Sequence, residues 1–373
     1  MQALRCVLFL CATTVAAAQS NSPSSQPWQM QESGTTAGLR GIHSVDGTVA
    51  WASGTGGTIL KTTDAGQHWQ KCSVPDGNKD GTTLDFRGVQ AWDANTAIVM
   101  ASGPGDKSRL YKTTDGCKTW TLLYTNPDRD GFWDALVSDE HGSAMLLGDP
   151  VRGRFALWQV FSWRSVDLPG EEGGRFRFPP RARAGESAFA ASNSALFVES
   201  AFFNFWFATG GIHGSRVIRR INHDFDDFAF NTFPSSEVPV GNRTASSGVF
   251  SLSFRPDRHA DNHETDYFAG IAVGGDYAKA NDSDHTAAYT LDSGKTWTAS
   301  AAPPHGYRSA VQFSHDLDLW ITAGTNGSDI SRDDGRTWQP LDNGNWNALS
   351  LPFIVGPNGR IARLNPAALS AGK

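Results

Sequence analysis

The chain has 373 residues, of which 39% are hydrophobic and 19% are charged, and it carries a formal net charge of −6. This balance is typical of a folded globular protein and excludes a disordered chain, while the negative charge disfavours general affinity for nucleic acid. Aspartate outnumbers glutamate by 30 to 8 and glycine occurs 39 times, so turns are favoured over helix surfaces.

The N-terminal residues predict export. Arg5 precedes an apolar, alanine-rich run, and the small residues up to Ala18 provide a cleavage site before Gln19. We expect a signal peptide at residues 1–18 and a flexible, serine- and proline-rich linker at 19–27. No later apolar run approaches the length of a membrane span, so a secreted or periplasmic protein without an integral membrane segment is expected.

One short motif, Ser/Thr-x-Asp-x-Gly-x-x-Trp, occurs four times and dominates the pattern of the chain. The aspartate can accept backbone N–H bonds across a tight turn, the glycine supplies a positive φ, and the tryptophan brings a large ring to bury. We call these four segments the aspartate turns. Their residues are Thr62, Asp64, Gly66 and Trp69; Thr113, Asp115 and Trp120; Thr290, Asp292, Gly294 and Trp297; and Ser331, Asp333, Gly335 and Trp338.

The aspartate turns lie within repeats of about forty residues, each with four short strand-like runs. In the first repeat these runs lie at 39–45, 49–54, 58–63 and 68–72. A repeat of this size and order is typical of one blade of a β-propeller. Further repeats follow at 86–124, 132–168, 187–230, 249–297 and 307–341, and the third and fourth lack an intact aspartate turn.

The last repeat has only three runs of its own, between residues 346 and 364. The N-terminal run at 28–33 resembles the strand that follows each aspartate turn and can supply the missing fourth strand. Closing the ring in this way removes open sheet edges. We therefore predict an all-β fold, a single seven-bladed propeller at 28–364 followed by a tail at 365–373.

The motifs also resemble a known family. The aspartate turns, with LRGI, AWASGTGGT, DFRGV, YKTTDG, GIAVGGDY, GYRSAV and GRIAR, are similar to the BNR-like (Asp-box), YVTN-type propellers related to photosystem II stability/assembly factors. The resemblance covers about residues 28–364. It implies a propeller fold, no cofactor, and a protein partner held on an arginine-rich face. The chain departs from the pattern at Cys117, which replaces a glycine, and at the two eroded turns.

A partner-binding site is expected where the first strands of the repeats line the central channel. Converging guanidinium groups bind carboxylate or phosphate groups bidentately, so a protein or peptide partner with anionic groups is expected, bound by a monomer. The family resemblance carries over only to the three arginines. Alternatively, these arginines pair with acidic channel residues, including nearby Asp85, in a structural network. The aligned candidates are Arg40, Arg87, Asp134, Glu186, Arg308 and Asn347.

Two other functions stay open at this stage. Sialidases share the aspartate turns and need an arginine cluster with a tyrosine nucleophile, for which Tyr307 beside Arg308 is the candidate. However, their Arg-Ile-Pro signature is missing and glutamate is scarce, so we assign no catalytic residue. A purely structural or adhesive repeat protein is the other alternative.

Cysteine and metal chemistry are less clearly indicated. Cys72 and Cys117 remain after cleavage, and an even number in an oxidising compartment permits a disulfide, with two buried thiols as the alternative. The segment at 258–266 places His259, Asp261, His263 and Asp266 close together, with Asp282, Asp284 and His285 further along the chain. Their spacing is compatible with Zn²⁺ or Ca²⁺, but no rigid element fixes them, so no metal is predicted.

Overall fold

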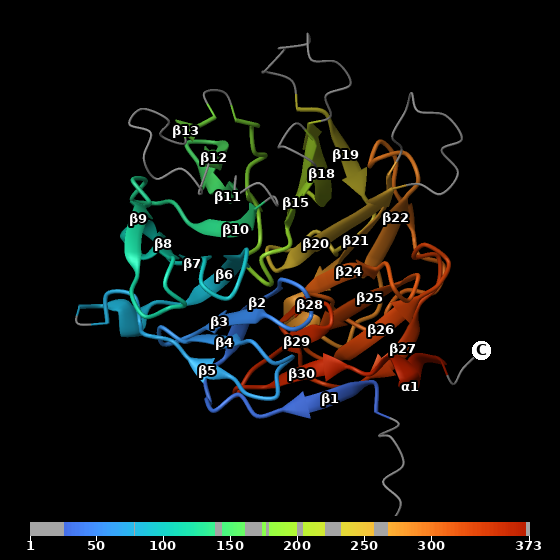
Figure 1. Ribbon diagram of the computed structural model, residues 1–373. Coiled ribbons are helices and arrows are strands. Elements are labelled where there is room, and N and C mark those ends of the chain that lie inside the picture. Colours follow the sequence, from blue (N-terminus) through green and yellow to red (C-terminus); the bar gives the residue numbers. More distant parts are fainter. Residues whose placement is uncertain are drawn as a thin grey trace, which may run out of the picture.

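The computed structural model describes residues 26–77, 79–138, 144–160, 174–176, 179–199, 204–220, 233–256 and 268–370. These residues form seven antiparallel sheets arranged around a central channel, a seven-bladed β-propeller, as the sequence predicts (Figure 1). The expected signal peptide and most of the linker lie outside the described residues. Within the described parts, no helix combines the length and apolar character that a membrane crossing would need.

Each blade has four strands, given from the innermost outward. Blade 1 contains β2 (Leu39–Ser44), β3 (Ala50–Gly54), β4 (Ile59–Thr62) and β5 (Gln70–Lys71). Blade 2 contains β6 (Phe86–Ala91), β7 (Ala97–Ala101), β8 (Arg109–Thr113) and β9 (Thr121–Thr125). Blade 3 contains β10 (Trp133–Ser138), β11 (Ala144–Val151), β12 (Arg154–Val160) and β13 (Gly174–Arg175).

Blade 4 contains β15 (Leu196–Glu199), β16 (Asn204–Ala208), β18 (Ser215–Arg220) and β19 (Ser235–Val238). Blade 5 contains β20 (Ser247–Pro256), β21 (Phe268–Asp276), β22 (Ala287–Thr290) and β23 (Thr298–Ala299), and its inner edge is extended by β17 (Gly210–Gly211) and β14 (Glu186–Ser187). Blade 6 contains β24 (Ala310–Ser314), β25 (Leu319–Gly324), β26 (Gly327–Ser331) and β27 (Gln339–Asp342). Blade 7 contains β28 (Ala348–Ser350), β29 (Phe353–Val355), β30 (Ile361–Leu364) and β1 (Trp28–Gln31).

The core lies between the blades. The second strands β3, β7, β21 and β25 are buried along their whole length, because both of their faces pack against other strands. The second strands also carry three fully buried tryptophans, Trp51 in β3, Trp206 in β16 and Trp320 in β25. Removal from water makes each of them contribute on the order of 2–3 kcal/mol. Continuous apolar runs rather than alternating ones therefore mark these strands in the sequence.

The ring closes as predicted, because the N-terminal strand β1 pairs antiparallel with β30 near the C-terminus. A short helix, α1 (Pro366–Ser370), follows within the predicted tail, and its Leu369 packs into the same cluster as Trp28 of β1. Gln31 then connects blade 7 to blade 1. Its side-chain amide donates to the Ala65 carbonyl (3.0 Å) and accepts from Trp69 Nε1 (3.0 Å).

Replacing Gln31 with alanine is expected to lower the free energy of unfolding by about 1–2 kcal/mol, because two hydrogen bonds across the closure are lost. Gln29, on the same strand but exposed, gives a matched control, since Gln29→Ala should change the stability by less than about 0.5 kcal/mol. Denaturant titrations followed by tryptophan fluorescence measure both. Equal stability of the two variants would contradict a role of Gln31 in closure.

The four aspartate turns share one hydrogen-bond pattern. The Thr62 hydroxyl donates to the Asp64 carboxylate (2.9 Å) and accepts from the Gly66 amide (2.9 Å). The carboxylate accepts from the His68 amide (2.9 Å), which lowers the pKa of Asp64 to about 2. Gly66 has a φ of 83°, in the left-handed region that glycine adopts without strain. The same contacts recur around Asp115, Asp292 and Asp333.

A side chain from the preceding blade holds each aspartate turn. The partners are Gln31 with Ala65, Lys61 with Gly116, Trp206 with Ser293, and Arg255 with Asp334. A disulfide between Cys72 and Cys117, whose Cα atoms are 5.3 Å apart, adds a covalent link between blades 1 and 2 at the second turn. The aspartate turns therefore fasten neighbouring blades to each other, which is a structural role.

Candidate functional site

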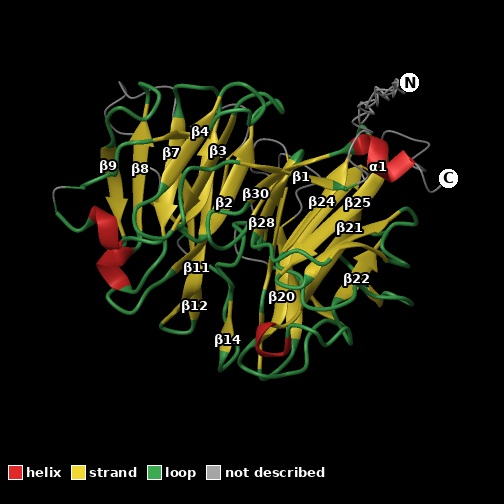
Figure 2. Cartoon of the chain, turned by 90° about the horizontal axis from the view of Figure 1, so that it is seen from below, coloured by secondary structure: helices red, strands yellow, loops and turns green. Residues whose placement is uncertain are grey.

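The innermost strands of the blades begin at one face of the propeller, which we call the entry face. The aspartate turns follow the third strand of a blade and lie at the opposite face, because neighbouring strands are antiparallel. Figure 2 shows β14 at the entry face and α1 at the opposite face. The residues predicted for partner binding are those near the start of the innermost strands, so the site has to be sought at the entry face.

Several blades carry one extra residue near the start of the innermost strand, where the pairing register shifts. This residue is Arg40 in β2, Arg87 in β6, Asp134 in β10 and Phe250 in β20. Such a bulge redirects a side chain, in this case to the channel mouth. Asn347, just before β28, takes the equivalent place in blade 7. The structure thus places four of the six predicted residues at one level of the entry face.

Arg308 departs from the prediction by one residue. In blade 6, Ala310 pairs with Ala323 and the Ser309 amide bonds to the Ala323 carbonyl, so Ser309 takes the place that Arg40 has in blade 1. Because side chains alternate along a strand, a shift of one residue turns the side chain from the channel into the blade. Arg308 therefore points into blade 6.

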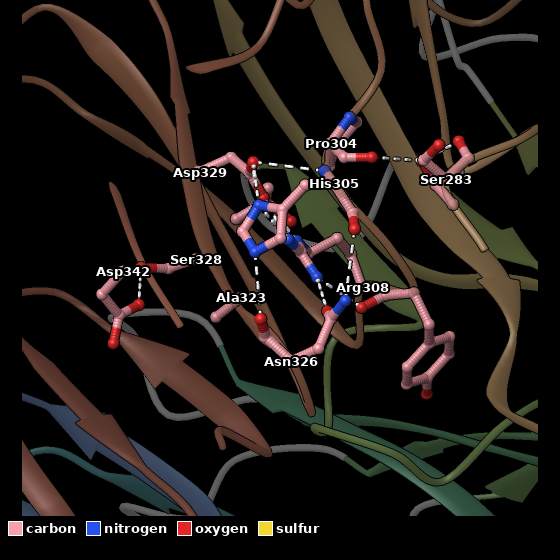
Figure 3. A network of polar contacts seen from close by, with 12 residues as sticks. Ser283, Pro304, His305, Arg308, Ala323, Asn326, Ser328, Asp329 and Asp342 are labelled. Atoms are coloured by element: carbon pink, nitrogen blue, oxygen red, sulfur yellow. Dashed lines mark hydrogen bonds and ion pairs between the residues drawn. The ribbon is translucent and has the colours of Figure 1, made fainter. Parts of the chain in front are cut away.

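All three guanidinium nitrogens of Arg308 are engaged inside the blade, as Figure 3 shows. Nε donates to Asp329 Oδ2 (2.6 Å), and Nη1 donates to the Tyr307 carbonyl (2.8 Å) and to Asn326 Oδ1 (2.5 Å). Nη2 contacts both Asp329 and His305. The exposed fraction of Arg308 is 0%, and burial lowers its pKa against the opposing effect of Asp329. Arg308 is thus buried and fully paired within blade 6, and this position does not favour its predicted contact with a partner.

Glu186 also lies away from the predicted position. It belongs to β14 at the inner edge of the blade 5 sheet, whereas the innermost strand of blade 4 is β15. Its carboxylate forms a bidentate pair with Arg216 (2.6 and 2.8 Å) and accepts from the Thr209 hydroxyl (2.6 Å). Burial acts to raise the pKa of Glu186, but these hydrogen bonds lower it below the ordinary value. Glu186 therefore joins two blades rather than facing a partner.

The remaining two arginines share one carboxylate. Asp85 accepts a hydrogen bond from Arg87 Nε (2.9 Å) and lies 3.8 Å from Arg40 Nε. The alternative of a structural ion-pair network therefore describes Arg87 well. Among the residues that the structure describes, the Arg40 side chain makes no hydrogen bond and remains 35% exposed. The Asn347 side chain is engaged, because its amide donates to the Leu39 carbonyl (2.7 Å).

A segment that the sequence did not single out crosses the channel mouth. We call residues 188–194, between β14 and β15, the crossing segment. The Ala190 carbonyl accepts from Arg87 Nη1 of blade 2 (3.0 Å), and the Ser192 hydroxyl donates to the Ser309 carbonyl of blade 6 (2.5 Å). Ser194 bonds to Ser251 of blade 5. The crossing segment therefore spans the channel mouth from blade 2 to blade 6, at the same face as the predicted residues. A signal for this segment is present in the sequence. Apart from Phe189, its side chains are short, in the run Ala-Phe-Ala-Ala-Ser-Asn-Ser, as expected for a segment packed closely between blades.

Asp134 and Asp149 form a pair of interacting acidic residues, and Arg87 acts on Asp134 electrostatically. Asp134 is 2% exposed and its Oδ2 has no hydrogen-bond partner. Burial raises the pKa of Asp134 well above its usual range, the Asp149 carboxylate raises it further, and Arg87 opposes this. Burial also raises the pKa of Asp149 to about 6, although the Ala188 amide donates to it. Burial and the neighbouring Asp149 thus disfavour the ionised form of Asp134, which makes it a poorer anionic partner of the arginines than an exposed carboxylate.

The raised pKa of Asp149 predicts a particular dependence of stability on pH. A carboxyl whose folded pKa is above its unfolded value stabilises the fold fully below about pH 4, and this contribution is lost as the pH rises through about 6. Asp149→Asn should therefore gain about 1–3 kcal/mol relative to the wild type between pH 4 and pH 7.5. Urea titrations at several pH values measure this difference.

A variant of Asp80 provides the control of opposite sign. Hydrogen bonds from Arg109 and Lys107 hold the pKa of Asp80 below its ordinary range. The wild type should therefore be favoured over Asp80→Asn above about pH 4, and this advantage should disappear at lower pH. A constant difference between Asp149→Asn and the wild type across the range would contradict the assignment of Asp149.

Tyr307, the candidate nucleophile of the sialidase alternative, lies inside the structure. It is 4% exposed, burial raises its pKa far above the ordinary value, and its ring packs edge-on against Phe250 (centroids 4.9 Å apart). A nucleophile has to reach its substrate, and this hydroxyl is covered while the neighbouring Arg308 is fully engaged. The geometry therefore does not support a catalytic role for Tyr307.

Two open grooves lie outside the channel mouth. One of about 830 Å³ runs between residues 30–36 and the loop 357–360, and one of about 630 Å³ runs between residues 237–243 and Trp297. None of the six predicted binding residues lines either groove. The described residues, which include Asp282, Asp284 and His285, contain no group of three or more His, Cys, Asp or Glu side chains placed to share a metal ion. The histidines and aspartates at 258–266 lie outside the described residues.

Comparison with protein-family models gives no match, and comparison with curated proteins also gives none. Among solved structures, the chain is similar to YCF48 bound to a D1 peptide, with a TM-score of 0.59 and 16% identity over 94% of this chain and 99% of that one. It is also similar to YCF48 from Cyanidioschyzon merolae, with a TM-score of 0.60 and 16% identity over 91% and 99% of the two chains. The resemblance to photosystem II assembly-factor propellers is thus confirmed for the fold.

Proposed function

We propose that the chain is an exported, non-catalytic propeller that binds a peptide segment of a protein partner on its entry face, with Arg40 as the contact for an acidic group. The observation that carries this proposal is the state of Arg40. Its side chain is 35% exposed at the channel mouth, its Nε makes no hydrogen bond among the described residues, and the nearby Asp85 is already hydrogen-bonded to Arg87. Guanidinium groups in this state bind carboxylates bidentately.

The fold and the crossing segment support the same proposal. A propeller of the same architecture, YCF48, has been solved with a D1 peptide bound. In the present chain the crossing segment spans the channel mouth, so a partner that binds Arg40 and lies over this segment contacts the surface of the entry face. An extended peptide segment satisfies this geometry, and its side chains can contact more than one blade. The buried position of Tyr307 does not favour a nucleophile of the sialidase type at this residue.

Capture of the partner and mapping of its binding segment test the proposal. The exported protein is used to capture its partner from envelope and secreted fractions, overlapping peptides of that partner are scanned, and the dissociation constant of the best peptide is measured. Arg40→Ala should weaken binding by about tenfold or more. Arg336→Ala, an exposed arginine in an aspartate turn on the opposite face, should leave the affinity unchanged. Equal affinity of wild type and Arg40→Ala would remove the proposal.

A further inference from the structure

Blade 5 presents aromatic side chains at the level where blades 1 and 2 present arginines. Phe250 occupies the same extra position in β20 that Arg40 and Arg87 occupy in β2 and β6. Figure 1 shows β6 and β20 on opposite sides of the ring. The channel mouth therefore has a cationic side and an aromatic side.

The aromatic side is a packed group with an exposed edge. The Phe250 ring is stacked on Phe189 of the crossing segment (centroids 4.0 Å apart) and contacts Tyr307 and Tyr277 edge-on. Phe250 and Tyr307 are buried, whereas Phe189 is half-buried and Tyr277 is 55% exposed. Tyr277 begins the short 3₁₀ helix η3 (Tyr277–Lys279). We call Phe189, Phe250, Tyr277 and Tyr307 the aromatic rim.

A large ring that is half exposed over a rigid aromatic base is a typical anchor for a partner side chain, because ordering it costs little further entropy. Ile212, in the turn after β17, is another exposed apolar side chain of the same face. By contrast, the other side of the ring carries Arg40, whose Nε makes no hydrogen bond among the described residues. The two sides are thus complementary to two different chemical groups of one ligand, an acidic group and an apolar side chain.

We propose that the entry face selects an extended peptide that carries an acidic group at one end, bound by Arg40, and an aromatic or large aliphatic side chain several residues away, bound against Tyr277 of the aromatic rim. This inference rests on the proposed function and adds the second determinant of specificity. The crossing segment lies between the two sides, where Ala190 and Ser192 hold it against blades 2 and 6. An extended peptide that passes over this segment can reach both sides of the channel mouth.

Selection from a random dodecapeptide phage library tests both determinants separately. The wild type should select peptides enriched in an acidic residue and in an aromatic or aliphatic residue. Tyr277→Ala should lose the apolar enrichment and bind the wild-type peptides about tenfold more weakly, while Tyr277→Phe should keep both properties. Leu291→Ala, an exposed apolar residue in an aspartate turn on the opposite face, is the matched control and should change neither.

The outcomes separate this inference from the proposed function. If Arg40→Ala loses the acidic enrichment while Tyr277→Ala selects the same peptides as the wild type, the proposed function stands and the aromatic anchor is wrong. If Arg40→Ala has no effect, the proposed function fails independently of Tyr277. If sedimentation shows a dimer that Tyr277→Ala dissociates, the aromatic rim binds a second copy of the chain and the peptide proposal is overturned. Failure to select any peptide counts against both.

Discussion

Replacing Asp329 with alanine is expected to lower the free energy of unfolding by about 3–5 kcal/mol, because it leaves the Arg308 charge buried without a counter-ion. Arg308 and Asp329 are both 0% exposed, and Asp329 also contacts the His305 ring (2.7 Å). A loss of this size is a large part of the total stability of an ordinary domain. Guanidinium titrations of the two proteins measure it as a shift of the midpoint.

Two variants show whether the loss comes from burial of the charge. Glu237→Ala breaks an ion pair with Arg183 in which both side chains are exposed, and it should cost less than about 1 kcal/mol. The double variant Arg308→Met, Asp329→Leu removes both charges and should recover most of the stability lost in Asp329→Ala. If Asp329→Ala and Glu237→Ala cost the same, Arg308 is not held as the structure shows.

The fold could be predicted because the sequence marks both ends of each hairpin. Aspartate turns such as Thr62–Trp69 fix the third and fourth strands of a blade, and the apolar runs before them fix the first two. The need to close the ring predicts the fourth strand of the last blade, and β1 supplies it. In this fold the local signals and the global architecture agree, so the repeats and the closing strand together predict the number of blades.

The candidate site could be predicted only where the strands keep a common register. Arg40 and Arg87 stand before a glycine in LRGI and FRGV, and the structure places them at the same level. Arg308 stands in a similar string, but its neighbour Ser309 takes the channel position. A signal for this difference is present at Asp329. It lies in β26 at the position that the buried Leu60 has in β4. A carboxylate at a buried position indicates that a cation is buried beside it.

The alignment of Glu186 failed for a different reason. The fourth repeat has no aspartate turn from which its strands could be counted back, and the chain makes an additional strand, β14, before it enters blade 4. The local sequence does not distinguish β14 from an ordinary blade strand. It lengthens the sheet of the next blade by pairing with β17, a residue pair that is distant in the sequence. The crossing segment escaped prediction for the same reason, since its partners Arg87 and Ser309 are distant in the sequence.

Removing the link between Cys72 and Cys117 is expected to lower the free energy of unfolding by about 2–4 kcal/mol. The disulfide closes a loop with a sequence separation of 45 residues and so restricts the unfolded chain. Cys117 also replaces the glycine of the second aspartate turn, and its φ of 69° lies in the left-handed region. Cys117 thus combines a stabilising cross-link with a backbone conformation that a side chain disfavours.

The two effects can be separated by the residue placed at position 117. In a Cys72→Ala background, Cys117→Ser keeps a β-carbon at the left-handed position and should show the full loss, whereas Cys117→Gly should lose about 1 kcal/mol less. Unfolding of the wild type by guanidinium with and without dithiothreitol gives the cross-link contribution alone. Because Gly66 holds the same position in the first turn, the glycine variant should keep the turn geometry. If the reduced wild type were as stable as the oxidised one, or if serine and glycine at position 117 were equivalent, the corresponding half of this account would fail.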